Sequence, residues 1–313
     1  MEQIDTSVRA NSQLFTQPPT LTQVSHGPAI GKDAERLQYQ EMAQDFMNQA
    51  EMMQKMRHMT TSSQKTPRLN VSVDEVRRFN PRLSDFIVKD PLGALKMFQD
   101  HLNQAMKSMR DDSKTASSGE KVAAQQDNFP KKSTIYYVNF EGNFGRNHVT
   151  PRGLRSNLLN QFVEVSGIVT KMSLVRQRIE TSVHYCEESK RGHVKHYTDN
   201  KNLEQLARAH AHEDLCTEDN NGFLVADAQG RPLSTEYGYC VYRDYQEIVL
   251  QEMPERTPTG QLPRSVRVIL ENDLVDKTKP GDRVHITGVY RANLNTNQTH
   301  SAIVENFIIA TGV

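Results

Sequence analysis

A chain of 313 residues is long enough to bury a sizeable core and to form two or three domains. Its 38 basic and 38 acidic residues cancel, so net charge does not point to nucleic acid, although basic residues outnumber acidic ones 11 to five between Lys131 and His196. Three cysteines exclude a paired disulfide framework and no apolar run reaches membrane-spanning length, so we expect a soluble, intracellular protein.

The N-terminal segment predicts a polar tail followed by a helix. Residues 1–33 are rich in Gln, Ser, Thr and Pro and predict a disordered tail. From Asp33 to about Met59, apolar spacings of three and four predict one helix. Its stripe consists of Tyr39, Met42, Phe46, Gln49, Met53 and Met56. The stripe faces either its own domain, which is the simpler interpretation, or a partner.

Two more local patterns complete this N-terminal region. The run Leu69–Val73 is typical of a short strand, and Ser72 and Glu75 have the spacing of a capping box that begins a helix. A further helix is predicted at Leu92–Met109. Together these elements predict a helical subdomain over residues 34–110.

From Thr134 onward the pattern is β-rich, after a segment at 111–133 whose Ser, Ala, Gln and Lys content predicts a linker. Short apolar runs separated by turn residues predict a small barrel. The predicted strands are Ile135–Val138, Phe162–Thr170, Val183–Tyr185, Tyr239–Val241, Tyr245–Leu250, Val266–Leu270, Val284–Tyr290 and Ala302–Ile309. A short helix is predicted at Asn202–Ala211.

The loop Gln251–Ser265 stands out because Pro254, Pro258, Gly260 and Pro263 leave little room for a helix. A short, stiff loop between barrel strands indicates a functional lever. An ordinary surface crossover is the alternative, and it would be the preferred interpretation on composition alone.

Several segments, in this order, resemble the minichromosome maintenance (MCM) replicative helicase family. They are EGNFGRNHVTPRGL (141–154), GIVTKMSLVR (167–176), SVHYC (182–186), QEMPE (251–255), GQLPRS (260–265), DLVD (273–276) and KPGDRV (279–284). The sequences of these motifs are most similar to those of the third paralogue group of the family. The resemblance implies an α+β fold, with the helical subdomain followed by a β-rich OB-fold barrel over residues 134–313. It also implies an inserted, degenerate zinc-ribbon-like subdomain at about 180–240 with its own small sheet.

Basic residues on the predicted barrel are candidates for DNA contact. OB-folds bind single strands with cations that neutralise phosphates, and three such cations lie within 169–178. The resemblance implies one DNA contact at Lys171 and Arg176 and a second near Arg264 and Arg267. The full set of candidates is Lys171, Arg176, Arg178, Arg264, Arg267 and Arg291. A solvated basic face is an equally open interpretation.

The hairpin after Tyr290 is a further candidate. In the family this hairpin points into the central channel and usually carries basic residues. Here its polar, turn-rich tip keeps only Arg291 and His300, so the sequence predicts a weak DNA contact at the tip.

The insertion offers metal-ligating residue types in a spacing that favours no metal. MCM relatives often place paired cysteines here, whereas His184 and Cys186 are followed by Ser189 at the position where a second cysteine is wanted. Further ligand types are scattered downstream, at His193, His196, His210, His212 and Cys216. We treat Cys186 and His184 as weak candidates only.

No phosphate-binding GxxxxGK[S/T] motif is present, because the one Gly-Lys pair, Gly31–Lys32, is followed by Asp33. No nucleophile–base pair or paired carboxylates stand out either. We therefore expect no catalytic residues, no cofactor and no ATP hydrolysis by this chain alone. ATP and Mg²⁺ are implied only for the ATPase domain, which in the family would begin after Val313.

The resemblance implies a DNA-encircling collar of the MCM two-to-seven heterohexamer, acting in nuclear replication licensing, initiation and unwinding. Implied partners are other MCM subunits, single- and double-stranded DNA, and origin-loading and fork factors, with no membrane. The loop would pass nucleotide state from the ATPase tier through Glu252, Pro254, Gly260 and Pro263. The alternatives are a free-standing OB-fold module that binds single-stranded DNA or regulates, and a zinc-dependent interaction module. A reading frame continuing past Val313 into a Walker A sequence would favour the helicase.

Overall fold

The computed structural model describes residues 30–61, 68–117, 136–197, 203, 224–226, 229–294 and 304–313. The predicted tail, the helix at Asn202–Ala211 apart from Leu203, and the hairpin tip with His300 lie outside these residues. From residue 40 onward the chain forms one compact unit. None of the described helices is both long and apolar enough to span a bilayer.

Five helices form the N-terminal part: α1 (Ile30–Met47), α2 (Ala50–Thr61), α3 (Val73–Phe79), α4 (Pro81–Lys89) and α5 (Pro91–Ser117). Two of them begin at a proline, whose fixed φ suits the first helical turn. Asn80 caps α4, because its side chain accepts a hydrogen bond from the Arg82 backbone N–H at 2.9 Å. Helix α4 was not predicted from the sequence, and α5 runs through Ser117 into the segment predicted to be a linker.

The single helix predicted from Asp33 to Met59 is two helices, α1 and α2. Phe46 and Met47 are buried before the break, and Met52 and Met56 are buried after it, whereas Gln49 is exposed. The six-residue step from Phe46 to Met52 does not fit a 3.6-residue period, so a continuous helix could not bury both groups. With the break between them, α1 and α2 can each turn their own apolar face toward the core.

The helices pack on a small parallel sheet of β1 (Arg68–Ser72) and β2 (Tyr137–Glu141). As predicted, α3 begins after Ser72, but the Ser72 side chain makes no capping hydrogen bond. A chain of aromatic rings continues the core from the helices into the barrel. Centroid distances are 6.4 Å for Phe46–Phe98, 5.2 Å for Phe98–Phe140 and 5.7 Å for Phe140–Phe162. Such pairs stabilise beyond the area they bury.

Five strands close into the barrel: β4 (Phe162–Met172), β10 (Arg283–Leu294), β11 (Val304–Gly312), β9 (Ser265–Glu271) and β8 (Val241–Gln251). In this order each strand pairs with the next, and the last, β8, also pairs with the first, β4, which closes the barrel. Aliphatic side chains on alternating positions fill the interior, as the period of two predicted. At Gly288 a side chain would overlap the backbone oxygen of Ile309, so this position needs glycine for close strand approach. The α+β prediction is confirmed.

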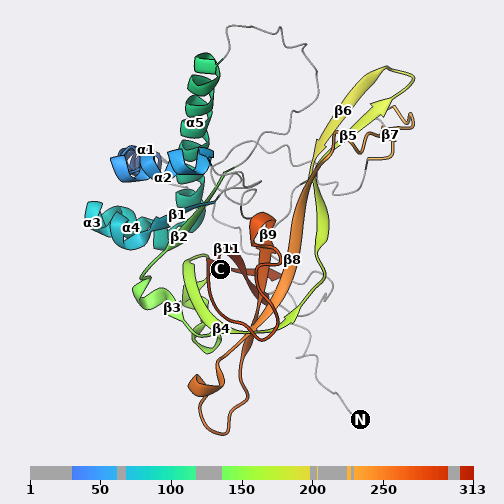
Figure 1. Ribbon diagram of the computed structural model, residues 1–313. Helices are drawn as coiled ribbons and strands as arrows, with labels where there is room; N and C mark the ends of the chain where they lie inside the picture. The colour runs from blue at the N-terminus through green and yellow to red at the C-terminus, as the bar shows by residue number, and fades with distance from the viewer. Residues whose placement is uncertain are drawn as a thin grey trace, which may run out of the picture. The chain divides into compact units, whose positions relative to one another are not determined.

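The strands that the structure describes in the inserted region belong to the same sheet as the barrel and do not form the separate small sheet that the resemblance implied. The strands β5 (Arg176–Cys186) and β8 extend together, and β6 (Arg191–His196) and β7 (Ser234–Thr235) pair with the far half of β5 (Figure 1). The run predicted as a strand at Tyr245–Leu250 lies within β8. Of the strand predicted at Tyr239–Val241 only Val241 belongs to β8, because Tyr239 lies in the turn before it. Strand β6 was not predicted, because its Lys, Arg and His residues hide the period of two.

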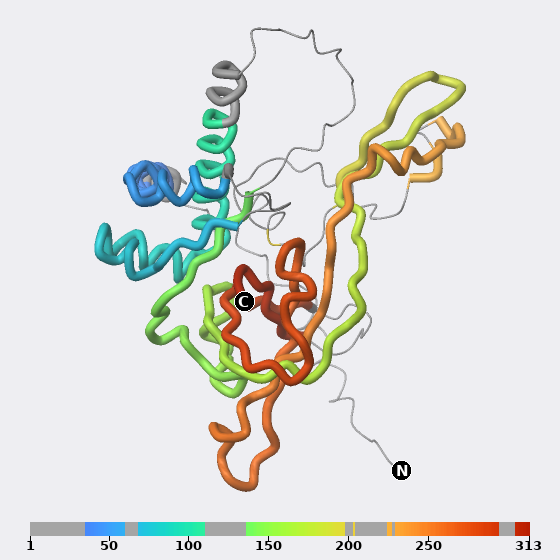
Figure 2. Tube along the Cα trace, in the orientation of Figure 1, coloured from blue at the N-terminus to red at the C-terminus, as the bar shows by residue number. Residues whose placement is uncertain are grey.

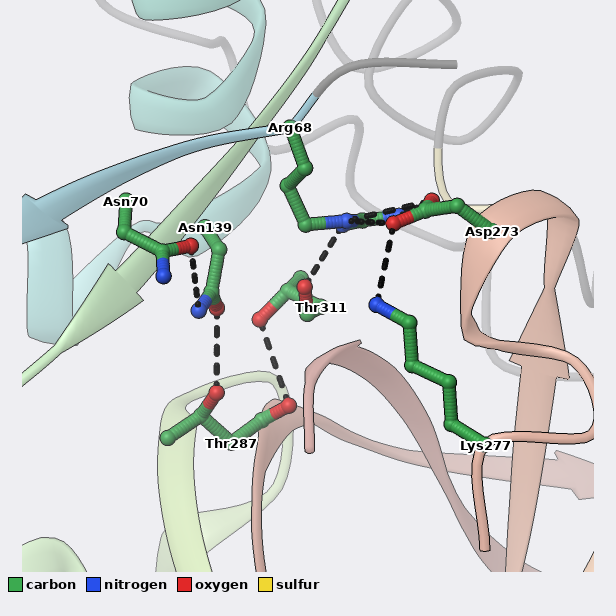
Figure 3. A network of polar contacts seen from close by, with 7 residues as sticks. All are labelled: Arg68, Asn70, Asn139, Asp273, Lys277, Thr287 and Thr311. Atoms are coloured by element: carbon green, nitrogen blue, oxygen red, sulfur yellow. Dashed lines mark hydrogen bonds and ion pairs between the residues drawn. The ribbon is translucent and has the colours of Figure 1, made fainter. Parts of the chain in front are cut away.

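A polar network joins the small sheet to the barrel (Figure 3). Arg68 on β1 donates three hydrogen bonds to the Asp273 carboxylate, at 2.6, 3.0 and 3.2 Å, and a fourth to the Thr311 carbonyl at 2.5 Å. Asn139 on β2 accepts a hydrogen bond from the Thr287 hydroxyl at 3.0 Å. Hydrogen bonds between segments far apart in the sequence thus connect β1 and β2 to the barrel.

Candidate nucleic-acid interface

Two of the predicted DNA-binding residues lie in one row across the barrel. Lys171 on β4 lies opposite Val249 on β8, and Val249 lies opposite Arg267 on β9. Residues directly opposite each other in a sheet project from the same face. Because Lys171 is exposed and Val249 and Arg267 are half-buried, this is the outer face of the barrel.

A β-bulge is responsible for the position of Lys171. Val169 pairs with Leu250 in the core, and strict alternation would turn Lys171 toward the core as well. The register shifts between Val169 and Lys171, so Lys171 pairs with Val249 instead of continuing the alternation. The extra residue rotates the lysine to the outer face.

Arg176 and Arg178 lie on the same outer face, nearer the inserted region. Arg176 pairs with Tyr245 and Arg178 pairs with Arg243. The Arg178 guanidinium stacks over the Tyr245 ring, 3.6 Å from its centroid. Burial, followed by a hydrogen bond to Glu247, raises the pKa of the Tyr245 hydroxyl, which therefore stays neutral. Since Arg178 covers the ring, Tyr245 positions an arginine and is not itself exposed for base stacking.

Arg264 and Arg267 line a hollow of about 600 Å³ beside the loop that follows β8. Arg267 forms an ion pair with Glu305 on β11, whereas Arg264 is exposed at the end of the loop. The two arginines that the resemblance implied as a second DNA contact therefore share one concave surface. Arg267 also belongs to the row with Lys171, so the two implied contact regions adjoin on one outer face.

Arg291 lies at the root of the β10–β11 hairpin. Its guanidinium donates a hydrogen bond to the Asn160 side-chain oxygen at 2.9 Å, and partial burial lowers its pKa. Its position is therefore set by the segment preceding β4.

The loop between β8 and β9 is anchored at its base by a residue that the sequence analysis missed. Arg152 donates to the Glu252 carboxylate at 3.0 and 3.3 Å, to the Leu262 carbonyl at 2.9 Å, and to the Gln261 side chain. The Glu252 side chain is 1% exposed and that of Arg152 is 22% exposed. One arginine thus ties both ends of the loop to the segment before β4. No spacing in the sequence pairs residues 100 positions apart.

Two further contacts hold the other side of this loop, which projects from the barrel (Figure 2). Arg283 on β10 forms an ion pair with Glu255 at 2.5 Å, and Arg256 donates to the Ser166 hydroxyl at 3.1 Å. A hydrogen bond from its own backbone and one from Arg283 lower the pKa of Glu255. Gly260 has a positive φ of 80° at the tip, where glycine is favoured. Although its carbonyl is bound by Arg152, Leu262 is 88% exposed.

His184 and Cys186, the weak metal candidates, are buried on β5. Both ring nitrogens of His184 already have hydroxyl partners, Ser182 at 2.7 Å and Thr235 at 3.1 Å. Burial, followed by the charges of His193 and Lys195, lowers the pKa of His184, which favours the neutral ring. In the described part of the chain, the structure does not bring these two residues into a cluster of three possible ligands.

Comparison with known proteins assigns both halves of the chain. Residues 36–142 match the MCM N-terminal domain, and residues 148–294 match the MCM OB domain. The chain is 39% identical over 247 residues to the DNA replication licensing factor mcm3 of Schizosaccharomyces pombe, covering 79% of this chain and 26% of the relative. It is 37% identical over 283 residues to the zygotic DNA replication licensing factor mcm3 of Xenopus laevis, covering 90% of this chain and 31% of the relative.

A third relative, the DNA replication licensing factor MCM3 of Gallus gallus, is 37% identical over 265 residues, which cover 85% of this chain and 29% of the relative. The chain thus spans between a quarter and a third of the length of these relatives. The two domain matches meet at the boundary between the helical part and the barrel, and the relatives confirm the resemblance seen in the sequence. The chain belongs to the MCM family, of which it carries the N-terminal and OB domains.

Proposed function

We propose that this chain is a DNA-encircling collar of a replicative helicase subunit. The observation that carries the proposal is the joined basic face, on which Lys171 and Arg267 share a row and Arg264 lines the adjoining hollow. A sugar–phosphate backbone following this face would meet cations from β4, from β9 and from the loop that ends at β9. OB-folds bind nucleic acid through such surfaces.

The relatives support a role in the nucleus during replication licensing, since their names describe DNA replication licensing factors. By the same likeness, we propose other MCM subunits as partners in a heterohexamer and single- and double-stranded DNA as ligands. Origin-loading and fork factors complete the proposed partners. ATP and Mg²⁺ belong, in this proposal, to an ATPase tier and not to the two domains described.

DNA binding is tested by fluorescence anisotropy of a labelled single strand across a salt series. We expect log K to fall linearly with log salt, by about 0.7 for each phosphate neutralised on a single strand. The double variant Lys171→Ala/Arg264→Ala should bind more weakly and reduce that slope by about 1.4. Arg82→Ala, which removes an exposed arginine on α4, is the matched control and should bind as the parent does. An unchanged slope in the double variant would refute this face as the contact.

The anchored loop supports a second part of the proposal, namely contact with the ATPase tier. A loop held by Arg152, Arg283 and Ser166 transmits displacement, and its exposed Leu262 offers an apolar contact for a neighbouring tier. In this interpretation Glu252 anchors the loop, while Pro254, Gly260 and Pro263 shape it.

The variant Leu262→Asp tests whether the loop Gln251–Ser265 transmits nucleotide state or is only a connection between two strands. Because Leu262 packs little in this chain, the free energy of unfolding should change by less than about 0.5 kcal/mol. In a reconstituted hexamer, the same variant should reduce the stimulation of ATP hydrolysis by DNA. Val225→Asp, at another exposed apolar residue, is the control. Equal stimulation in both variants and the parent would leave the loop as a crossover and favour a free-standing binding module.

A further inference from the structure

Three possible metal ligands meet on the barrel, away from the inserted region. His148 on β3 (His148–Val149), Glu164 on β4 and His285 on β10 lie on three neighbouring strands. The His148 Nδ1 atom is 2.9 Å from one Glu164 carboxylate oxygen, and the His285 Nδ1 atom is 3.6 Å from the other. The three ligand atoms all lie within 4.8 Å of one another.

The strand register explains this meeting. His148 lies directly opposite Glu164 in the parallel β3–β4 pair. On the other side of β4, Glu164 lies opposite Thr287, and His285 is two residues along from Thr287 on the same face. The pleat thus projects all three side chains from one face, with the carboxylate between the imidazoles. The two rings lie 6.1 Å apart, at 21° to each other.

We propose that His148, Glu164 and His285 form a binding site for a divalent transition-metal ion, for which zinc is the best fit. Zinc binds histidine nitrogen and carboxylate oxygen at about 2.0–2.2 Å, so adjacent tetrahedral ligands lie about 3.4 Å apart. The two nitrogen–oxygen separations, 2.9 and 3.6 Å, lie on either side of that value. The nitrogen–nitrogen separation, which is within 4.8 Å, can adjust by rotation of His285, whose side chain is 60% exposed.

The surroundings suit an ion with one open coordination position. Glu164 and His285 line a cavity of about 670 Å³ that is open to solvent, which provides an entry path and room for a water ligand. Glu141 and Asp273 line the same cavity, together with Arg68, which forms an ion pair with Asp273, and Lys277, so the negative charges there are largely balanced. Two histidines with one carboxylate are ligands typical of zinc sites that keep a position open.

An ion here would tie the short strand β3 to the well-paired barrel strands β4 and β10. The structure pairs β3 with β4 over only two residues, and β3 follows directly on the segment that leads out of β2. Coordination of His148 would hold this edge against β4 and β10. Binding to the folded state alone raises its stability in proportion to the logarithm of ion concentration.

The test uses the whole chain, stripped of metal with a chelator, and Zn²⁺ or Co²⁺ as the probe. We expect one ion per chain by calorimetry, a rise in Tm with zinc concentration, and a Co²⁺ spectrum without thiolate charge-transfer absorption. Glu164→Gln and His285→Ala should each weaken zinc binding by about 100-fold or more, since loss of an outer-shell partner alone costs 10–100-fold. His285 is exposed, so its variant should fold as the parent does without metal.

Two control variants test whether histidine or cysteine residues of the inserted region bind the ion instead. His196→Ala removes an exposed histidine on β6 and should leave affinity unchanged, as should Cys186→Ser. A Co²⁺ spectrum with thiolate absorption that Cys186→Ser abolishes would place the ion in the inserted region and overturn the proposal. Absence of zinc binding, or binding that survives both Glu164→Gln and His285→Ala, would overturn it equally.

Discussion

Arg68→Met will destabilise the protein by about 3 kcal/mol, because it leaves the largely buried Asp273 carboxylate without its main partner. The pair is bidentate, and both side chains are only 12–13% exposed. Lys277, at 3.4 Å from Asp273, is too exposed to replace the arginine. Chemical denaturation of the whole chain measures the effect. Arg77→Met, which breaks the exposed pair with Asp74, is the control and should lower the free energy of unfolding by less than about 1 kcal/mol.

A double-variant comparison separates loss of the pair from loss of packing. Arg68→Met/Asp273→Leu removes both charges and should recover most of the stability, since an apolar pair of similar volume often replaces a buried ion pair without cost. If the double variant were no more stable than Arg68→Met, the arginine would act through packing or through its hydrogen bond to the Thr311 carbonyl.

The same pair predicts a pH dependence of stability. Burial by itself would raise the pKa of Asp273, but the hydrogen bonds and charge of Arg68, aided by Lys277, lower it below its usual value. A carboxyl group whose pKa is lowered on folding contributes stability above its unfolded pKa and loses it as pH falls through the folded pKa. The stability difference between the parent and Arg68→Met should therefore shrink on the acid side of the usual aspartate range. A difference that grows on acidification would contradict this account.

Arg152→Met is expected to have the second large effect, about 3 kcal/mol, because Glu252 becomes a buried carboxylate without its cation. Besides stability, the variant should change local motion. Arg152 holds Gln261 and Leu262 as well as Glu252, so backbone amides of residues 257–264 should exchange hydrogen faster. Denaturation and hydrogen exchange by mass spectrometry measure the two effects on the same samples.

Arg283→Met provides the matched control for this loop. It removes the ion pair with Glu255, in which the two side chains are 61% and 58% exposed, so the cost should stay below about 1 kcal/mol. If Arg152→Met and Arg283→Met destabilised the protein equally, burial of Glu252 would not be the source of the effect. If exchange in the loop were unchanged in Arg152→Met, the order of the loop would come from its prolines and from its contacts with Arg283 and Ser166 instead.

The sequence by itself was sufficient for the class of fold, most strands and the family. Alternating apolar residues mark β4, β9 and β10 because a half-buried strand must alternate. Pro91 marks the start of α5, since proline suits a first helical turn. The ordered MCM motifs, supported by the comparisons, identified the family. These features depend on neighbours along the chain, which a sequence displays directly.

Only the tertiary structure decided which distant residues share a surface. Lys171 faces outward because a bulge interrupts the alternation that would turn it inward, and no local pattern announces that bulge. Arg68 meets Asp273 across 205 positions, and Arg152 meets Glu252 across 100. His148, Glu164 and His285 meet through the register of three strands. Strand register and barrel closure are set by packing of the whole core, so the contacts that depend on them appear only once the chain is folded.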